Sequence, residues 1–182
     1  MEWTDDEILE AFKKPLQKEQ AFNLLVSRYS KRIYWHVRRM VQEHEDANDL
    51  TQDIFIKIWN NLSEFRGDAG LYSWIYRITA NETLSFLRKQ QRIPVRQQEV
   101  QADPVMTAEQ AMSATRDSHA ILVHLEAAIA QLPDKQRQVF IMRYYDELKY
   151  EEIEQILGTS IGALKASYHH AVKKIATYLR KI

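Results

Sequence analysis

Apolar residues at helical spacing are the feature that most limits what this chain can fold into. They recur every three to four positions in several long stretches, most clearly in 18–42 and 46–62. This spacing gathers them on one face of an α-helix, where they can be buried together. The chain has only four glycines and four prolines, so few positions demand a turn. The pattern predicts an all-α protein.

The composition excludes several classes of protein. The chain has no cysteine, which excludes disulfide scaffolds, thiol catalysis and zinc held by cysteine. No apolar run approaches the roughly twenty residues that span a membrane. The acidic start, residues 1–7, lacks the basic and then apolar order of a signal peptide. We therefore expect a cytoplasmic protein without membrane insertion.

A segment without apolar periodicity separates two helical pieces. It contains Pro94, Pro104, several glutamines and scattered small residues. Proline disfavours helix in the residue before it, and such a composition is typical of a linker. We interpret residues 93–118 as a flexible linker that joins two small helical domains, residues 1–92 and 119–182.

The predicted helix over 18–42 carries a basic face. The residues expected to be exposed there are Arg28, Lys31, Arg32, Arg38 and Arg39. His36 and His44 lie eight positions apart with no third ligand nearby, so we interpret both as solvated surface histidines. The sequence predicts no metal site and no cofactor.

The C-terminal piece contains a helix-turn-helix pattern. A short helix predicted over 150–157 ends at Gly158, a typical residue after a helix C-terminus. Thr159 or Ser160 can cap the next helix, which extends to about Arg180. Two helices joined by a short turn with glycine are typical of a helix-turn-helix motif. The apolar residues expected to face inward on the second helix are Leu164, Tyr168, Ala171, Val172, Ile175 and Leu179.

The outward face of that second helix is basic. The formal net charge of the chain is zero, yet residues 160–182 contain no acidic residue. The polar and basic residues expected to face outward are Lys165, Ser167, His169, His170, Lys173 and Lys174. Such a helix can enter the major groove of DNA, with early residues at base edges and lysines at phosphates. This face favours nucleic-acid binding over a purely structural surface helix.

Several separated motifs resemble one known family. They are Asp-Leu-Thr-Gln-Asp-Ile-Phe-Ile-Lys-Ile-Trp (49–59), Phe-Arg-Gly-Asp-Ala-Gly-Leu-Tyr-Ser-Trp-Ile-Tyr-Arg-Ile-Thr-Ala-Asn (65–81), Leu-Pro-Asp-Lys-Gln-Arg-Gln-Val-Phe (132–140) and Tyr-Glu-Glu-Ile (150–153). In this order they resemble the extracytoplasmic function (ECF) sigma factors of the sigma-70 family. The resemblance implies a protein that binds core RNA polymerase and directs promoter-specific transcription initiation. Residues 1–92 would then be region 2, and residues 119–182 region 4.

The resemblance also implies roles for residues of region 2. The helix that begins near Asp46 would dock on core RNA polymerase through Asp49, Gln52 and Asp53, with Asn48 where the family often has glutamate. The following loop and helix would melt the minus-ten promoter element and capture a flipped base, which needs a pocket and positive charge along the strand. The residues implied for this minus-ten contact are Tyr72, Tyr76, Arg77, Asn81, Arg88, Lys89 and Arg92.

Region 4 would read the minus-thirty-five element. The residues implied are Thr159, Ser160, Lys165, Ser167, His169, His170, Lys173 and Lys174. Ser167 and His170 stand where many family members carry arginine, the usual reader of guanine. We therefore expect a promoter motif that differs from the family's common one. The resemblance further implies an anti-sigma factor as a partner, in addition to core RNA polymerase and promoter DNA.

The sequence also allows or disfavours functions of other classes. A stand-alone helix-turn-helix regulator with a helical N-terminal sensing or interaction domain is the alternative, although a simple repressor needs neither the acidic helix nor the aromatic loop. A helical adaptor for proteins is disfavoured by the acid-free end of the chain. An enzyme is not expected, because no HExxH motif, phosphate-binding glycine loop or Ser-His-Asp setting is present.

Overall fold

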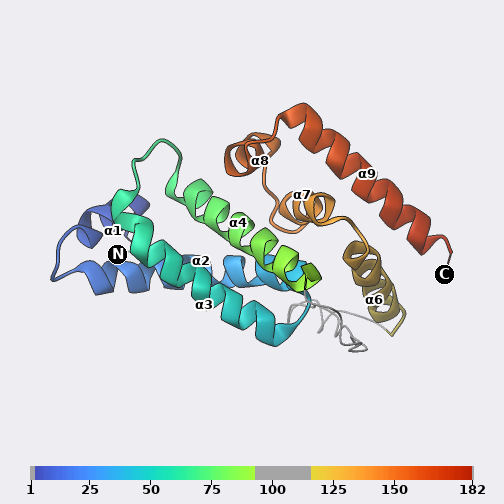
Figure 1. Ribbon diagram of the computed structural model, residues 1–182, viewed down its shortest axis with the longest axis horizontal. Helices are drawn as coiled ribbons and strands as arrows, with labels where there is room; N and C mark the ends of the chain where they lie inside the picture. Colours follow the sequence, from blue (N-terminus) through green and yellow to red (C-terminus); the bar gives the residue numbers. More distant parts are fainter. Residues whose placement is uncertain (1–2, 93–115, 182) are drawn as a thin grey trace.

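The computed structural model describes residues 3–92 and 116–181, and those residues form helices joined by short turns, without a β-strand. The N-terminal half contains α1 (Asp5–Phe12), α2 (Lys18–Val41), α3 (His44–Asn61), a 3-10 turn (Leu62–Glu64) and α4 (Leu71–Arg92). The C-terminal half contains α6 (Arg116–Ala130), α7 (Asp134–Tyr144), α8 (Tyr150–Leu157) and α9 (Ile161–Leu179) (Figure 1). The all-α prediction is confirmed. Most of the predicted linker lies outside the described residues, and its last residues, 116–118, belong to α6.

Helix ends follow local signals in the sequence. The Thr4 hydroxyl accepts from the backbone N–H of Glu7, and the Glu7 carboxylate accepts from the Thr4 N–H at 2.6 Å, which together form a capping box. Gly158 follows α8 with φ +63°, in the left-handed region that glycine adopts without strain. Ser160 caps α9 by accepting from the Ala163 N–H. The predicted end of α8 at Gly158 and the predicted cap of α9 are confirmed, with Ser160 as the capping residue.

The N-terminal half has its own apolar core. Helices α1 to α4 bury large aliphatic side chains completely, among them Leu25, Ile33, Ile54, Ile58 and Ile75. Each such side chain contributes about 1.5–3 kcal/mol on burial. This core fixes α3 and α4 side by side. The side of each helix that faces away from the other is left out of this core.

A second core holds the helix-turn-helix motif in place. It joins α6, α7 and α9 through Ile129, Phe140, Ala171 and Ile175. The prediction that Val172 faces inward is wrong, because its side chain is 40% exposed. Helix α9 lies along the outer edge of the molecule (Figure 1), so only one narrow stripe of it is covered by neighbours.

A third cluster joins the two halves. Tyr76 and Ala80 of α4 pack against Val139 and Met142 of α7 and Ile153 of α8. Figure 1 shows α7 and α8 on the side of α4 that faces away from α3. The sequence does not predict this contact, because nothing in a helical pattern says which distant helix will cover it.

Candidate polymerase and nucleic-acid interfaces

An acidic face of α3 is open to solvent. Asp49, Gln52 and Asp53 are exposed, whereas Ile54 is fully buried. The three exposed residues follow the spacing of one helix face, and Ile56 beside them is 59% exposed. Within the part of the chain that the structure describes, neither carboxylate forms an ion pair. The predicted polymerase-contact residues therefore share one accessible, negatively charged face.

Two tyrosine rings in contact, tilted by 35° to each other, form an aromatic surface on α4, called here the tyrosine wall. The rings of Tyr72 and Tyr76 lie 4.6 Å apart, and the Tyr29 ring lies 6.1 Å from that of Tyr72. The Arg32 guanidinium stands over the Tyr72 ring at 5.3 Å. Burial raises the pKa of Tyr76 far above its usual range, so its hydroxyl stays protonated. Both hydroxyls are buried; they approach each other but form no hydrogen bond of normal geometry with each other or with another described residue.

The other residues predicted for the minus-ten contact lie on another face of α4. Arg77, Asn81, Arg88 and Arg92 are exposed and are separated by four, seven and four positions, so they share one face of the helix. Lys89 is also exposed, on the flank of this row. The structure thus brings the basic residues together in a line but does not place the two tyrosines in it.

Helix α9 presents the residues predicted for the minus-thirty-five contact. Most of its predicted contact residues are exposed, namely Ser160, Lys165, His169, His170, Lys173 and Lys174. Thr159 and Ser167 are half-buried. The Lys165 ammonium lies 5.7 Å from the centre of the Tyr150 ring, which orients it at the start of the helix. The early part of α9 is therefore free to approach base edges.

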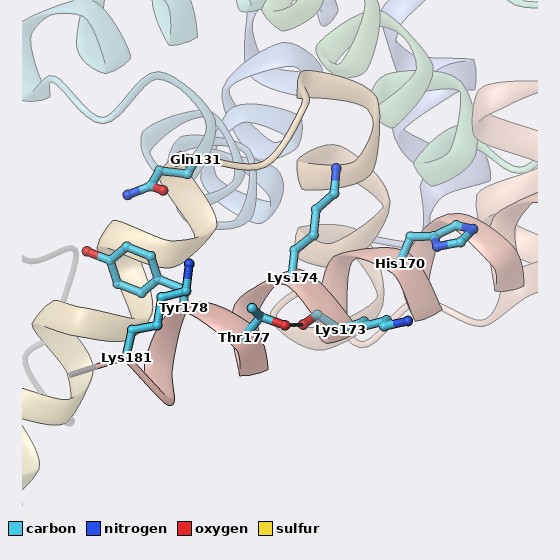
Figure 2. A pocket seen from close by; sticks show the side chains of 7 residues that line it. All are labelled: Gln131, His170, Lys173, Lys174, Thr177, Tyr178 and Lys181. Atoms are coloured by element: carbon cyan, nitrogen blue, oxygen red, sulfur yellow. Dashed lines mark hydrogen bonds between the residues drawn. The ribbon is translucent and has the colours of Figure 1, made fainter.

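A basic groove runs along the later part of α9. It has a volume of about 350 Å³ and is lined by Gln131, His170, Lys173, Lys174, Thr177, Tyr178 and Lys181. Figure 2 shows that these side chains come from α9 and its C-terminal end, with Gln131 from the turn after α6. The Thr177 hydroxyl donates to the Lys173 carbonyl at 2.8 Å. The lining contains no acidic residue, so the groove suits an anion such as a phosphate.

Sequence reasoning missed residues that connect the two halves. His36 is completely buried, and its Nδ1 lies 2.6 Å from the Asp146 carboxylate of the α7–α8 turn, so its interpretation as a solvated histidine is wrong. Arg38 was expected to be exposed but is only 7% exposed. His36 lies on a face of α2 that the C-terminal half covers in part. No signal within 18–42 could have revealed this, because the covering residues lie about a hundred positions away.

The described residues contain neither a cluster of metal ligands nor a membrane-spanning helix. Across residues 3–92 and 116–181, no group of three or more histidine, cysteine or acidic side chains is arranged to hold a metal ion. Among the described helices, none combines the length and apolar character needed to cross a membrane.

Comparison with known families matches both halves of the chain. Residues 25–93 match the family described as sigma-70 region 2, and residues 122–175 match the family described as sigma-70, region 4. Two solved structures share the fold. One is CnrH in complex with the cytosolic domain of CnrY (TM-score 0.69, 20% identity, covering 96% of this chain and 95% of that one). The other is the sigma factor RpoE with the anti-sigma factor NepR from Bartonella quintana (TM-score 0.70, 24% identity, 87% and 96%).

Curated relatives extend over almost the whole chain. The RNA polymerase sigma-H factor of Pseudomonas aeruginosa is 29% identical over 175 residues, covering 90% of this chain and 89% of that protein. The ECF RNA polymerase sigma-E factor of Escherichia coli K12 is 32% identical over 180 residues, covering 94% and 92%. The chain therefore belongs to the sigma-70 family of RNA polymerase sigma factors, within the extracytoplasmic function subfamily.

Proposed function

We propose that this chain binds core RNA polymerase and directs it to promoters that carry two upstream elements. The observation that carries this function is the presence of regions 2 and 4 in order within one chain. The chain has no chemistry of its own in this proposal, since the polymerase forms the bonds. It works in the cytoplasm, where the polymerase and the promoter are found.

The acidic face of α3 is the proposed docking surface for core RNA polymerase. Asp49 and Asp53 are exposed and have no ion-pair partner among the described residues, so a basic partner can pair with both. Gln52 adds a neutral donor and acceptor between them, and the exposed Ile56 adds an apolar contact. Interfaces commonly combine charged residues that set orientation with an apolar centre.

Helix α4 is the proposed site of strand separation. A flipped base needs an aromatic surface to stack on, and each stacked base contributes about 1–3 kcal/mol. Tyr72 and Tyr76 supply two adjacent aromatic rings, and the row from Arg77 to Arg92 supplies charge for the backbone of the separated strand. The two surfaces lie on adjacent faces of one helix. A DNA strand could therefore lay its backbone along the basic row while one base turns out of the stack toward the tyrosines.

Helix α9 is the proposed reader of the minus-thirty-five element. Its first three turns, with Lys165, His169 and His170, approach base edges, while the groove around Lys173 and Lys174 holds the phosphate backbone. Gln131, Tyr178 and Lys181 extend the predicted contact set, because they line the same groove. No arginine lies on this helix, so guanine recognition by a two-pronged side chain is not expected.

An anti-sigma factor is a proposed further partner. The two solved relatives are described in complexes with other chains, one of them named as an anti-sigma factor. The surfaces that this chain needs for polymerase and DNA are exposed or only covered by its own C-terminal half. A partner protein that binds them would switch the sigma factor off without any change in its fold.

Transcription by purified core RNA polymerase tests the proposed function. Sheared genomic DNA is transcribed with and without the protein, and RNA start sites are mapped. We expect new starts that share two upstream motifs at fixed spacing. A variant with Asp49→Lys and Asp53→Lys serves as a control that keeps the DNA-binding helices intact and should give no new starts. No new starts with the natural chain, together with binding of duplex DNA by the protein alone, would identify a stand-alone regulator instead.

A further inference from the structure

The two halves of the chain meet along a buried polar seam. We use "seam" for the contact of α2 and α4 with α7, the turn after it and α8. Hydrogen bonds that cross the seam join His36 Nδ1 to Asp146 Oδ2 (2.6 Å), Arg137 Nη1 to the Met40 carbonyl (2.8 Å), Gln138 Nε2 to the Ala80 carbonyl (3.2 Å) and Arg77 Nη2 to the Gln155 carbonyl (2.5 Å). At its rim, Ser73 Oγ lies 3.5 Å from Gln155 Oε1, and Gln91 Nε2 donates to Asp134 Oδ2 at 3.0 Å. The seam therefore fixes one defined arrangement of the two halves.

The seam covers the surface that the proposed function requires. Tyr76 is completely buried beneath α7 and α8, and Tyr72 packs against the same cluster. The Arg77 guanidinium, although exposed, is engaged with the backbone of α8. In this arrangement a flipped base cannot reach the Tyr76 ring, because side chains of the C-terminal half cover it, and the same cluster covers part of Tyr72.

The hydrogen bonding of buried polar groups is less complete in the seam than in the two cores. The hydroxyls of Tyr72 and Tyr76 are buried near each other without a well-formed hydrogen bond, and the buried Nε2 atom of His36 has no hydrogen-bond partner among the described residues. A buried polar group without a partner opposes burial, because it has lost its hydrogen bonds to water. All three groups would regain such bonds if the halves separated. The seam is thus suited to open while each core stays intact.

The His36–Asp146 pair is the centre of this seam. Both side chains are almost completely buried, at 0% and 5% exposure. His36 is the hydrogen-bond partner of the Asp146 carboxylate within the described residues. Arg39 also faces Asp146, but its guanidinium stacks on the Tyr145 ring at 4.2 Å and forms no hydrogen bond with the carboxylate. Removal of His36 would therefore leave a buried carboxylate without a hydrogen-bonded partner.

We propose that the chain inhibits itself, with the His36–Asp146 pair acting as a latch that holds region 4 over the tyrosine wall of region 2. The functional consequence rests on the proposed role of Tyr72 and Tyr76, whereas the latch itself does not. Removing one partner of a buried hydrogen-bonded pair disfavours the closed state, because the other is left unsatisfied, but replacing both partners by apolar residues can be nearly neutral. In the open state both positions are exposed to water, so neither change affects it much.

The test measures closure directly in the full chain. Because the natural sequence has no cysteine, Ser85→Cys on α4 and Glu151→Cys on α8 provide the only two attachment points for a donor and an acceptor dye. Both positions are exposed, and their helices pack against each other. We expect high energy transfer in the otherwise natural chain, a clear loss with His36→Leu, and recovery with the double change His36→Leu and Asp146→Leu.

A matched control separates the latch from the general loss of a histidine. His44 pairs with the Tyr34 hydroxyl at 2.7 Å, but entirely within the N-terminal half. His44→Leu should leave energy transfer unchanged, and circular dichroism should show unchanged helix content in every variant. Low transfer in the natural chain, or unchanged transfer in His36→Leu with intact helices, would overturn the proposal.

Binding of a fluorescent, thymine-rich single-stranded oligonucleotide gives a second reading. The apparent dissociation constant varies inversely with the open fraction, so a change from about one-tenth to about nine-tenths open strengthens binding about ninefold. We expect His36→Leu to bind more tightly by this order and the double variant to return to the natural value. If transfer falls but oligonucleotide binding does not change, the latch stands and the role assigned to Tyr72 and Tyr76 is wrong.

Discussion

The substitution Tyr76→Phe, which removes the hydroxyl of this side chain, is predicted to stabilise the protein. Its ring is fully buried, and the hydroxyl lies near that of Tyr72 but forms no hydrogen bond of normal geometry with a described residue. In the unfolded chain that hydroxyl bonds to water, so folding loses a hydrogen bond there, at a cost of about 1–3 kcal/mol. Tyr76→Phe keeps the ring contacts with Tyr72 and His36 and removes only this cost.

The size of the effect follows from the same comparison. We expect the free energy of unfolding to rise by about 1–2 kcal/mol, and Tm by about 2–8 °C for a chain of this length. Urea unfolding followed by circular dichroism, with a parallel thermal scan, measures both values. The slope of the urea transition should not change, because the surface exposed on unfolding is nearly the same.

The same substitution at Tyr29 supplies a control of opposite sign. Tyr29 is also buried, but its hydroxyl donates to the Asp5 carboxylate at 2.7 Å. Tyr29→Phe should therefore lower the free energy of unfolding by about 1.5–3 kcal/mol, since hydrogen bonds to charged groups contribute this much. If Tyr76→Phe destabilised the protein as much as Tyr29→Phe, the Tyr76 hydroxyl would have a partner in solution and our reasoning on the seam would fail.

Three further predictions address the proposed surfaces and the pH dependence. Asp49→Lys with Asp53→Lys should abolish transcription with core RNA polymerase while leaving helix content and duplex binding unchanged, as measured by circular dichroism and fluorescence anisotropy. Lys173→Ala and Lys174→Ala should each reduce the slope of log affinity against log salt by about 1, because each lysine releases one counterion; an unchanged slope would remove the groove from the DNA contact. Burial raises the pKa of Tyr145 to about 12. The unfolded chain therefore loses this proton first, so the stability contributed by neutral Tyr145 is complete below about pH 10 and is lost as pH rises toward 12, and Tyr145→Phe should make that decline shallower in urea titrations.

Helix ends and buried helix faces could be predicted from the sequence, because they depend on residues that are close together along the chain. The Thr4 capping box needs only residues three positions apart, and Gly158 ends α8 because a glycine adopts positive φ without strain. Helical spacing also identified which side of α3 is buried, and Asp49, Gln52 and Asp53 do lie on the exposed side. The outward face of α9 follows from the same spacing, apart from the misplaced Val172.

The candidate sites were only partly accessible for the same reason. The exposed residues of α3, α4 and α9 could be listed from periodicity and charge, and the resemblance of the motifs assigned their roles. The groove residues Gln131, Tyr178 and Lys181 were missed, because the groove forms only where the turn after α6 meets the end of α9. A pocket between elements depends on how they are arranged in space, which no local pattern reports.

By itself, the sequence determined the helices, their caps, their apolar faces and the two basic stretches, because each depends on residues within a few turns of one another. Only the tertiary structure decided that His36 and Arg38, which local patterns placed on the surface, and Tyr76, which the family resemblance placed beside a base, are buried. The burial of Tyr76 and His36 comes from residues far along the chain, with His36 and Asp146 separated by 110 positions. Whether such a surface is covered depends on two opposing free energies: the gain from burying apolar side chains at the seam and the cost of burying polar groups without partners. Both depend on residues from the two halves together, so neither can be read from one local segment.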